Sequence, residues 1–274
     1  MTKRVLIVTA LAGFVRSFLM SDIATLQDLG YEVHCAANAN HVGADDVLLY
    51  LQKHNVHYHQ IDFSSNKPLS FKTIKSFYQF WSLVRKNHFE YVHCHTPIAG
   101  AICRIILRKQ QRKKQVKIIY TTHGFYFHKL SSRKTWLVFY NIENLLSRWT
   151  NVIITINKED FNNAKKMYCK DVRYIPGVGV DLDRFHNVTI DISDYRSSLG
   201  LRDEDFVVLA IGEISQRKNQ KVVIKALAKA KIPNSVLLIC GADMAGGATK
   251  QELEYTANKN NVRVQFLGLR KDIP

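Results

Sequence analysis

The sequence predicts an α/β protein with two Rossmann-like, doubly wound parallel-sheet domains, the second of them incomplete. Strand-like apolar runs alternate with segments of helical spacing along almost all of the 274 residues. Most of these runs are continuously apolar, which is typical of parallel sheets covered by helices on both faces. A chain of this length corresponds to about two domains at ~150 residues each.

The first domain is expected to contain six strands, because short β-branched and aromatic runs end at turn residues. These are Val5–Thr9, Glu32–Ala36, Tyr58–Phe63, Tyr91–His95, Lys117–Thr121 and Asn151–Ile156. Apolar spacings of three and four predict helices between them. The helices are Ser17–Leu29, Ala44–His54, Phe71–Lys86, Ile98–Gln110, Lys134–Arg148 and Glu159–Met167. The first run also resembles a short signal peptide, but its β-branched residues favour a strand.

A domain boundary is expected where Pro176, Gly177 and Gly179 precede a polar stretch. The predicted domains are residues 1–189 and 190–274. The second domain offers the strands Phe206–Ile211, Val236–Cys240 and Arg263–Leu267, with helices Asn219–Lys229 and Thr249–Lys259 between them. Three strands leave a sheet edge unpaired.

The charge is strongly basic and uneven. The whole chain carries +16, of which residues 1–189 contribute +13 and residues 190–274 contribute +3. Residues 91–142 hold ten Lys or Arg and no acidic side chain. Such a stretch favours an anionic partner over a merely solvated surface, and phospholipid, nucleic acid and a phosphorylated substrate are all candidates.

The cysteines and the hydropathy pattern limit the class of protein. The five cysteines are odd in number and widely spaced without a C-x-x-C pair. This argues against a disulfide framework or a zinc ribbon, and it fits a reducing compartment. No apolar run reaches the ~18–20 residues that a membrane span needs.

The loop after the first strand lacks both a dinucleotide fingerprint and a Walker sequence. Gly13 would still allow close backbone approach at a helix N-terminus, and Arg16 could hold an anion there. The alternative is a tight turn with a solvated arginine. In the second domain, Arg217 and Lys218 precede a predicted helix. Their charge is unfavourable at the positive end of the helix dipole unless an anion lies between them, so they favour a phosphate site over a surface pair.

Histidines follow the fourth and fifth predicted strands. Alternation places His93 and His95 on one face and Cys94 on the other. His123 has the better claim to a ligand cavity, because Gly124 lets the chain turn sharply after it. These loops lack the third and fourth ligands and the supporting groups of a zinc site, so no metal site is predicted.

Six stretches together carry a family resemblance. They are YVHCHTPIAG (91–100), TTHGFYFH (121–128), NVIITINKEDF (151–161), RYIPGVGVDLDRF (173–185), IGEISQRKN (211–219) and VQFLGLRKDIP (264–274). In this order the chain resembles the retaining glycosyltransferases of family 4, also called group 1, which have the two-domain GT-B fold. It looks most like bacterial enzymes of capsule and exopolysaccharide assembly.

The resemblance implies that residues 1–189 bind the acceptor and residues 190–274 the nucleotide sugar. It also implies a role for several residues. Gly13 faces the donor diphosphate, Arg16 and His95 the acceptor, and His123 is the catalytic histidine near the transferred sugar. Arg217 and Lys218 neutralise the donor phosphates, whereas Glu213 stands where many relatives have arginine and receives no role. Cations that stabilise the departing phosphate make a metal, a cofactor and paired carboxylates unnecessary. The donor, expected to be UDP-linked, is a substrate.

The resemblance also implies partners and a location. The family's later E-x7-E segment lies beyond residue 274, so the chain is expected to be a fragment or truncated product with weak activity, or to need a protein partner that completes the second domain. A lipid-linked saccharide acceptor would place it in the cytoplasm, peripheral on the inner face of the membrane. The expected contacts with anionic lipid are Arg104, Arg108, Lys109, Arg112, Lys113, Lys114 and Lys117.

Other functions remain as alternatives. The apolar residues of Phe71–Lys86 could lie in the membrane interface or pack on the sheet. A nucleic-acid-binding module would account for the charge, but no recognition element accompanies it, and no nucleic-acid partner is expected. A non-catalytic partner subunit of another transferase is the other alternative.

Overall fold

The computed structural model describes residues 3–40, 44–64, 70–180, 182–186, 189–243 and 245–270. The chain divides into two compact units, residues 1–179 and 180–274. This division falls earlier than the boundary expected after residue 189. Each unit has its own parallel sheet and its own apolar core.

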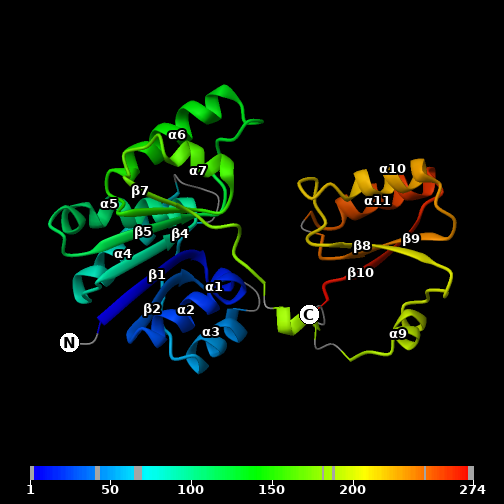
Figure 1. The fold of residues 1–274 in the computed structure, drawn as a ribbon, viewed down its shortest axis with the longest axis horizontal. Helices are drawn as coiled ribbons and strands as arrows, with labels where there is room; N and C mark the ends of the chain where they lie inside the picture. The colour runs from blue at the N-terminus through cyan, green and yellow to red at the C-terminus, as the bar shows by residue number, and fades with distance from the viewer. Residues whose placement is uncertain are drawn as a thin grey trace. The chain divides into compact units, whose positions relative to one another are not determined.

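The first unit contains a seven-stranded parallel sheet in the order β3-β2-β1-β4-β5-β6-β7 (Figure 1). The strands are β1 (Lys3–Leu11), β2 (Tyr31–Asn38), β3 (His57–Gln60), β4 (Tyr91–His95), β5 (Lys117–Thr122), β6 (Val152–Thr155) and β7 (Asp171–Tyr174). The six predicted strands are confirmed. β7 is an addition, four residues long and paired with β6, too short to show a periodic pattern. Strand order reverses between β1 and β4, as in doubly wound folds.

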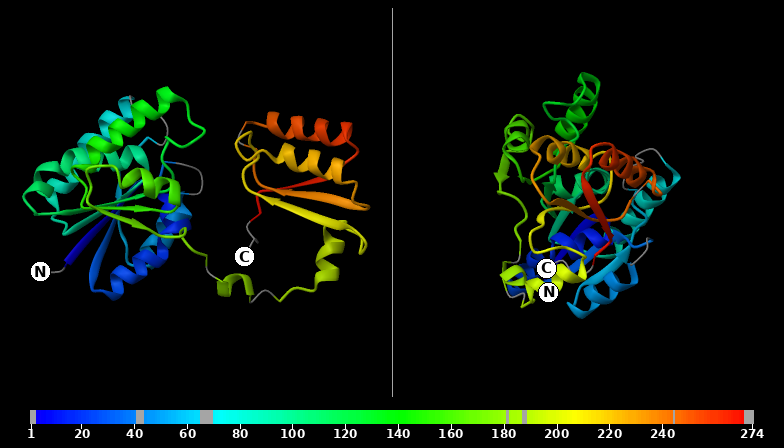
Figure 2. Two further views of the ribbon diagram at one scale, coloured as in Figure 1. Left: turned by 45° about the horizontal axis from the view of Figure 1, so that its top comes forward. Right: turned by 90° about the vertical axis from the view of Figure 1, so that its right-hand side faces the viewer.

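Helices cover both faces of this sheet (Figure 2). The helices α1 (Ala12–Phe18), α2 (Met20–Asp28) and α3 (Ala44–Lys53) enclose one core, in which Val15, Ile23 and Leu51 are buried. The opposite core receives side chains from α4 (Phe71–Lys86), α5 (Pro97–Arg112), α6 (Arg133–Ser147) and α7 (Lys158–Ala164). Burial on both faces explains why most of the strands are continuously apolar.

The first helical segment differs from its prediction. It begins at Ala12, before the expected Ser17, and breaks at Leu19. Leu19 is buried, and its backbone N–H donates to the carbonyl of Val15. Gly13 is therefore the second residue of a helix and not part of a loop.

The helix α4 has apolar side chains on two faces. Phe80 and Leu83 are buried in the core, so the helix packs on the sheet, which was one of the two arrangements predicted for it. A second stripe nevertheless faces solvent. Its members, with their exposed fractions, are Phe71 (91%), Ile74 (57%), Tyr78 (66%) and Trp81 (43%).

The second unit is a three-stranded parallel sheet in the order β10-β9-β8. Its elements are α8 (Leu182–His186), α9 (Ile192–Ser198), β8 (Phe206–Ile211), α10 (Gln220–Ala230), β9 (Ser235–Cys240), α11 (Ala248–Lys259) and β10 (Arg263–Gly268). Side chains of α10 and α11 share one core with the sheet. The short helices α8 and α9 lie where the sequence predicted an irregular polar stretch, and Asp191 caps α9 by accepting from the backbone N–H of Asp194.

Two further observations concern the whole described chain. All five cysteines are buried and unbridged. Among the described residues, no helix combines the length and apolarity that crossing a bilayer requires.

A buried ion pair joins α5 to α6. Arg104 is fully buried, and its guanidinium donates to both carboxylate oxygens of Glu143, at 2.8 and 3.3 Å. It also lies 4.0 Å from the ring centroid of Tyr120 and donates from Nε to the carbonyl of Gly100. Burial alone would lower the pKa of Arg104, but the charge of Glu143 reverses this and raises it. A side chain at Gly100 would crowd the Tyr120 ring, since a Cβ there would lie 3.0 Å from it.

We expect Arg104→Met to destabilise the first unit by about 3–5 kcal/mol, because it leaves the Glu143 carboxylate buried without a partner. The double variant Arg104→Met/Glu143→Leu should recover much of this loss, since it removes both charges. Urea unfolding followed by circular dichroism measures both. Lys109→Met, at an exposed position of the same helix, is the control and should change stability by no more than ~0.5 kcal/mol. A single variant as stable as the parent chain would contradict the role of the pair.

Candidate active site

Three histidines gather at the carboxyl ends of β4 and β5. Parallel pairing places His95 beside Thr121, and the chain reaches His123 two residues later. The predicted alternation is confirmed: Cys94 is buried in the core beneath α5, whereas His93 and His95 share the opposite face with ring centroids 4.2 Å apart. This face is the one covered by α1 and α2.

Hydrogen bonds and ring contacts hold the histidines together. Nδ1 of His95 lies 3.2 Å from Nε2 of His123, and Nε2 of His93 lies 2.8 Å from the Thr121 hydroxyl. The ring of Phe14, from α1, meets His123 edge-on at 4.8 Å. The remaining nitrogen of His95, Nε2, is buried and has no hydrogen-bond partner among the described residues. A buried polar atom of this kind is costly unless a ligand or water satisfies it.

A cavity of about 220 Å³ opens beside these rings. Its described lining consists of Phe18, Leu19, Asp22, His93, His95, Thr121, His123, Ile154, Ile175, Gly177 and Val178. The walls are therefore largely apolar, with imidazole, hydroxyl and carboxylate groups at a few points. Such a combination suits a small ligand with several hydroxyl groups.

Burial keeps the three imidazoles neutral at pH 7. It lowers the pKa of His123, lowers that of His95 well below its usual value, and brings the pKa of His93 to about 4. Neighbouring imidazoles add to the effect at His93 and His95. A neutral imidazole donates from one nitrogen and accepts at the other, so these rings suit sugar hydroxyls better than phosphates.

Two predicted residues lie outside this cavity. Gly13 is in the first turn of α1, beside Phe14. Arg16 is in the last turn of the same helix, and its guanidinium lies 5.0 Å from the centroid of the Tyr50 ring of α3. Asp22, the acidic member of the described lining, was not among the predicted site residues. It stands in the first turn of α2, but the predicted helix began at Ser17, so the sequence carried no signal for it.

The predicted phosphate pair lies in the second unit, between β8 and α10. Asn219 at the start of α10 has φ +51° and no side-chain cap. Arg217 donates to Glu213 at 2.8 Å, which lowers the pKa of that carboxyl. Glu213 thus partly compensates the positive charge of Arg217 and Lys218, whereas the sequence had predicted that only a bound anion would do so. The pair is weak, however, because the Arg217 side chain is 72% exposed.

Glycines bring this loop close to the neighbouring strands. The N–H of Gly212 donates to the carbonyl of Cys240, and that of Gly241 to Gly268. A Cβ at Gly241 would lie 1.9 Å from the carbonyl oxygen of Gly212, a separation too short for any side chain. Gly241 is therefore required for the close approach at the carboxyl ends of the three strands.

The predicted membrane-contact residues differ in their exposure to solvent. Arg104 was a wrong assignment, because it is fully buried against Glu143. Arg108 is partly buried, with Nη1 donating to the carbonyl of Ile105. The others are exposed at the end of α5 and before β5: Lys109, Arg112, Lys113, Lys114 and Lys117.

Comparison with known proteins decides the family. The model for Glycosyltransferase Family 4 matches residues 23–184, and that for Glycosyl transferases group 1 matches residues 191–274. EpsD of Bacillus subtilis (strain 168), a protein assigned to the glycosyltransferases, is 31% identical over 280 residues, covering 100% of this chain and 70% of EpsD. The chain belongs to the family 4, group 1 glycosyltransferases. This membership does not favour a nucleic-acid-binding module or a non-catalytic subunit.

A second curated relative and two solved structures are also similar to this chain. The Escherichia coli UDP-Gal:alpha-D-GlcNAc-diphosphoundecaprenol alpha-1,3-galactosyltransferase is 28% identical over 214 residues, covering 74% of this chain and 53% of that enzyme. Anabaena HepE, solved with UDP and glucose, superposes with a TM-score of 0.73 at 18% identity over 98% of this glycosyltransferase and 70% of HepE. A glycosyltransferase from Rickettsia africae superposes with a TM-score of 0.74 at 16% identity, covering 99% of this chain and 69% of the Rickettsia chain. The predicted GT-B fold is confirmed.

We expect the folded chain to lose stability as the pH falls from about 7.5 to about 5, through the unfolded histidine pKa of ~6.5. The folded pKa of His93 lies below that value, so the unfolded state binds more protons in this window. Thermal unfolding midpoints across the window measure the effect.

His93→Gln should flatten this pH dependence, and His59, whose pKa burial lowers to about 4, should contribute part of the remainder. Val222→Ser, at an exposed position without a titratable group, is the control and should leave the slope unchanged. An unchanged slope in His93→Gln would show that His93 is not held neutral by the fold.

Proposed function

We propose that the chain transfers a hexose, with retention, from a UDP-linked sugar to a lipid-linked saccharide during capsule or exopolysaccharide synthesis. The observation that carries the proposal is the neutral His95–His123 pair at the cavity, whose imidazoles suit sugar hydroxyls. Two relatives support the choice of substrates. HepE was solved with UDP and glucose, and the name of the E. coli relative specifies a UDP-linked donor and a diphosphoundecaprenol-linked acceptor.

In this proposal His123 contacts the transferred sugar, and His95 holds the His123 ring in position. The hydrogen bond between the two rings fixes the orientation of His123, and the edge of Phe14 limits its rotation. His95 is buried, so its unpaired Nε2 is the atom that a hydroxyl or a water in the cavity would satisfy. The Asp22 carboxylate is available to accept a hydrogen bond from an acceptor hydroxyl. We assign Gly13 to the donor diphosphate and Arg16 to the acceptor.

The donor diphosphate is assigned to Arg217 and Lys218. Breaking the bond between the anomeric carbon and the phosphate oxygen leaves negative charge on the departing diphosphate. Cations placed next to this oxygen stabilise the transition state more than the ground state. An arriving diphosphate would compete with Glu213 for the exposed Arg217. Neither a cofactor nor a catalytic metal is needed in this scheme.

Arg217→Ala and Lys218→Ala should each lower kcat by about 100-fold or more, the loss expected for one transition-state donor. The assay measures UDP release from UDP-sugars with an undecaprenyl-diphosphate-linked saccharide, and turnover should persist with EDTA.

Lys225→Ala, at an exposed lysine of α10, is the matched control and should keep the parent rate. His123→Ala should lower kcat as well, whereas His128→Ala should not. Full activity in the Arg217 and Lys218 variants would contradict the phosphate assignment, and sugar transfer unaffected in His123→Ala would contradict the cavity assignment.

We further propose that the chain lies on the inner, cytoplasmic face of the cell membrane through the first unit. The exposed stripe of α4 carries Phe71 and Trp81, side chains that enter the interface of a bilayer. Lys72 and Lys86 are exposed on the same helix, and the exposed basic residues after α5 add further charge. Lysine and arginine near anionic lipid contribute about 1 kcal/mol each at low salt.

Vesicles of phosphatidylglycerol and phosphatidylcholine should sediment the chain at low salt, whereas vesicles of phosphatidylcholine alone should not. Phe71→Ser/Trp81→Ser should weaken retention about tenfold or more, since it removes two apolar side chains from the interface. Val222→Ser, an exposed apolar position in the second unit, is the control. Equal binding to neutral and anionic vesicles would count against the proposal.

A further inference from the structure

Four polar side chains lie on one face of the sheet at its β3 edge, away from the histidine cavity. Glu32 and His34 are two residues apart on β2, and His57 and His59 are two residues apart on β3. The parallel register places His34 beside His57 and Ala36 beside His59. Since side chains alternate along a strand, all four project from the same face.

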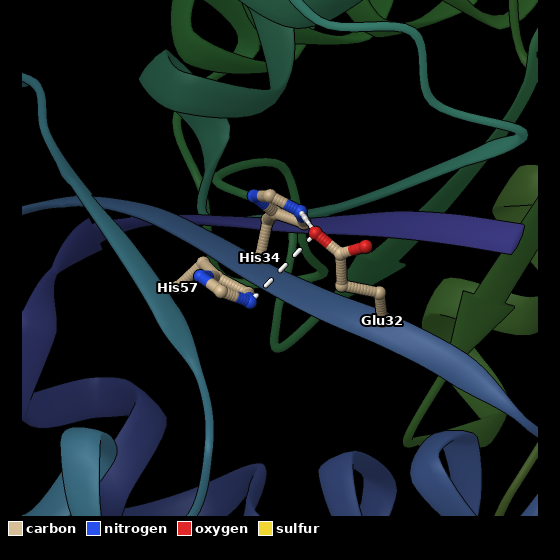
Figure 3. Close-up of side chains that lie close together, drawn as sticks. All are labelled: Glu32, His34 and His57. Atoms are coloured by element: carbon tan, nitrogen blue, oxygen red, sulfur yellow. Dashed lines mark hydrogen bonds and ion pairs between the residues drawn. The ribbon is translucent and has the colours of Figure 1, made fainter. Parts of the chain in front are cut away.

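Three of these side chains direct ligand atoms toward one point (Figure 3). Oε1 of Glu32 lies 2.8 Å from Nε2 of His34 and 3.7 Å from Nε2 of His57. All three atoms lie within 4.8 Å of one another. In a tetrahedral zinc site with bonds of about 2.0–2.1 Å, neighbouring ligand atoms lie roughly 3.3 Å apart. The separations of Glu32 Oε1 from the two imidazole nitrogens, 2.8 and 3.7 Å, lie on either side of this value.

The neighbouring groups are those that support a metal site. Arg4 donates to the other carboxylate oxygen of Glu32, Oε2, at 3.2 Å, which leaves Oε1 as a single ligand atom. Nδ1 of His34 lies 2.9 Å from Nε2 of His59, and the two rings are nearly parallel. A proton on Nδ1 of His34 would be accepted by His59, which frees Nε2 of His34 to bind a metal.

The exposure of the three groups differs in a way that suits binding from solvent. His34 is buried beneath Phe89, whose ring meets it edge-on at 5.2 Å. The Glu32 side chain is 23% exposed, and that of His57 is 59% exposed. Arg4 and His59 thus hold Glu32 and His34, whereas the exposed His57 approaches the same point from the solvent side.

We propose that Glu32, His34 and His57 form a binding site for a divalent transition-metal ion, Zn²⁺ being the preferred occupant. Two imidazoles and one carboxylate are ligands that zinc commonly takes, with water in the fourth position. Glu32 and His57 lie at the amino ends of β2 and β3, whereas the histidine cavity lies at the carboxyl ends of β4 and β5. The ion would therefore join the edge strand β3 to β2 and take no part in sugar transfer, so this proposal is independent of the proposed function.

The experiment uses the 274-residue chain without a histidine tag, freed of metal by EDTA and desalted. Titration with Co²⁺ should saturate at one ion per chain and give the intense visible absorption of a four-coordinate site. Zn²⁺ should displace Co²⁺ and raise the thermal unfolding midpoint, and Mg²⁺ should do neither.

Variants identify the ligands. His57→Ala and Glu32→Ala should each weaken Co²⁺ binding by more than tenfold and abolish the zinc-dependent rise in the unfolding midpoint. His59→Ala should weaken binding by about 10–100-fold, the effect of removing a group that orients a ligand. The exposed His54 provides the matched control, because His54→Ala should bind Co²⁺ as the parent chain does.

Three results would overturn the proposal. The first is undiminished binding in His57→Ala or Glu32→Ala. The second is loss of binding in His123→Ala with binding kept in His57→Ala, which would place the ion at the histidine cavity. The third is absence of stoichiometric Co²⁺ binding to the parent chain, which would reduce this cluster to a set of hydrogen bonds. The metal-free parent chain should transfer sugar whether or not it binds Co²⁺ when the metal is added, so the two proposals succeed or fail separately.

Discussion

The parallel pairing of β4 between β1 and β5 is the constraint on which the rest of the first unit depends. Both faces of the sheet are covered, so each residue of β4 must enter either the core or the candidate site. Cys94 enters the core, while His93 and His95 face the cavity. The pairing with β5 then brings His123 to His95. A slip of one residue would exchange core and site, so the stability of the sheet and the geometry of the site have the same origin.

Local patterns in the sequence predicted most of this arrangement. Periodicity of two and of three to four identified the strands and the main helices, and alternation assigned His93 and His95 to one face. The burial of Arg104 could not be predicted in this way. It stands in a run of basic residues, and its partner Glu143 lies 39 positions further along the chain. Only the packing of α6 on α5 brings them together. The break at Leu19 likewise reflects burial against the sheet and not any helix-breaking residue.

The helix α4 shows a second limit of periodic patterns. Its sequence contains an apolar stripe on each of two faces, one with Phe80 and the other with Phe71 and Tyr78. Spacing tells which residues share a face, but not which face the sheet will take. The cluster of Glu32, His34 and His57 was also visible only in part. The two-residue spacing of Glu32 and His34 is plain in the sequence, but these residues form a site with His57 only through the register of β2 with β3.

The burial of all five cysteines makes this chain a favourable subject for site-directed labelling. Thiols react with maleimides or spin labels mainly when they are exposed and ionised, so the native cysteines should remain largely unlabelled in the folded state. A cysteine introduced at exposed Lys113 and another at exposed Lys229 would then carry the labels, one on each unit. The distance between the two labels, measured with and without a nucleotide sugar, would report directly on whether a donor changes the separation of the units.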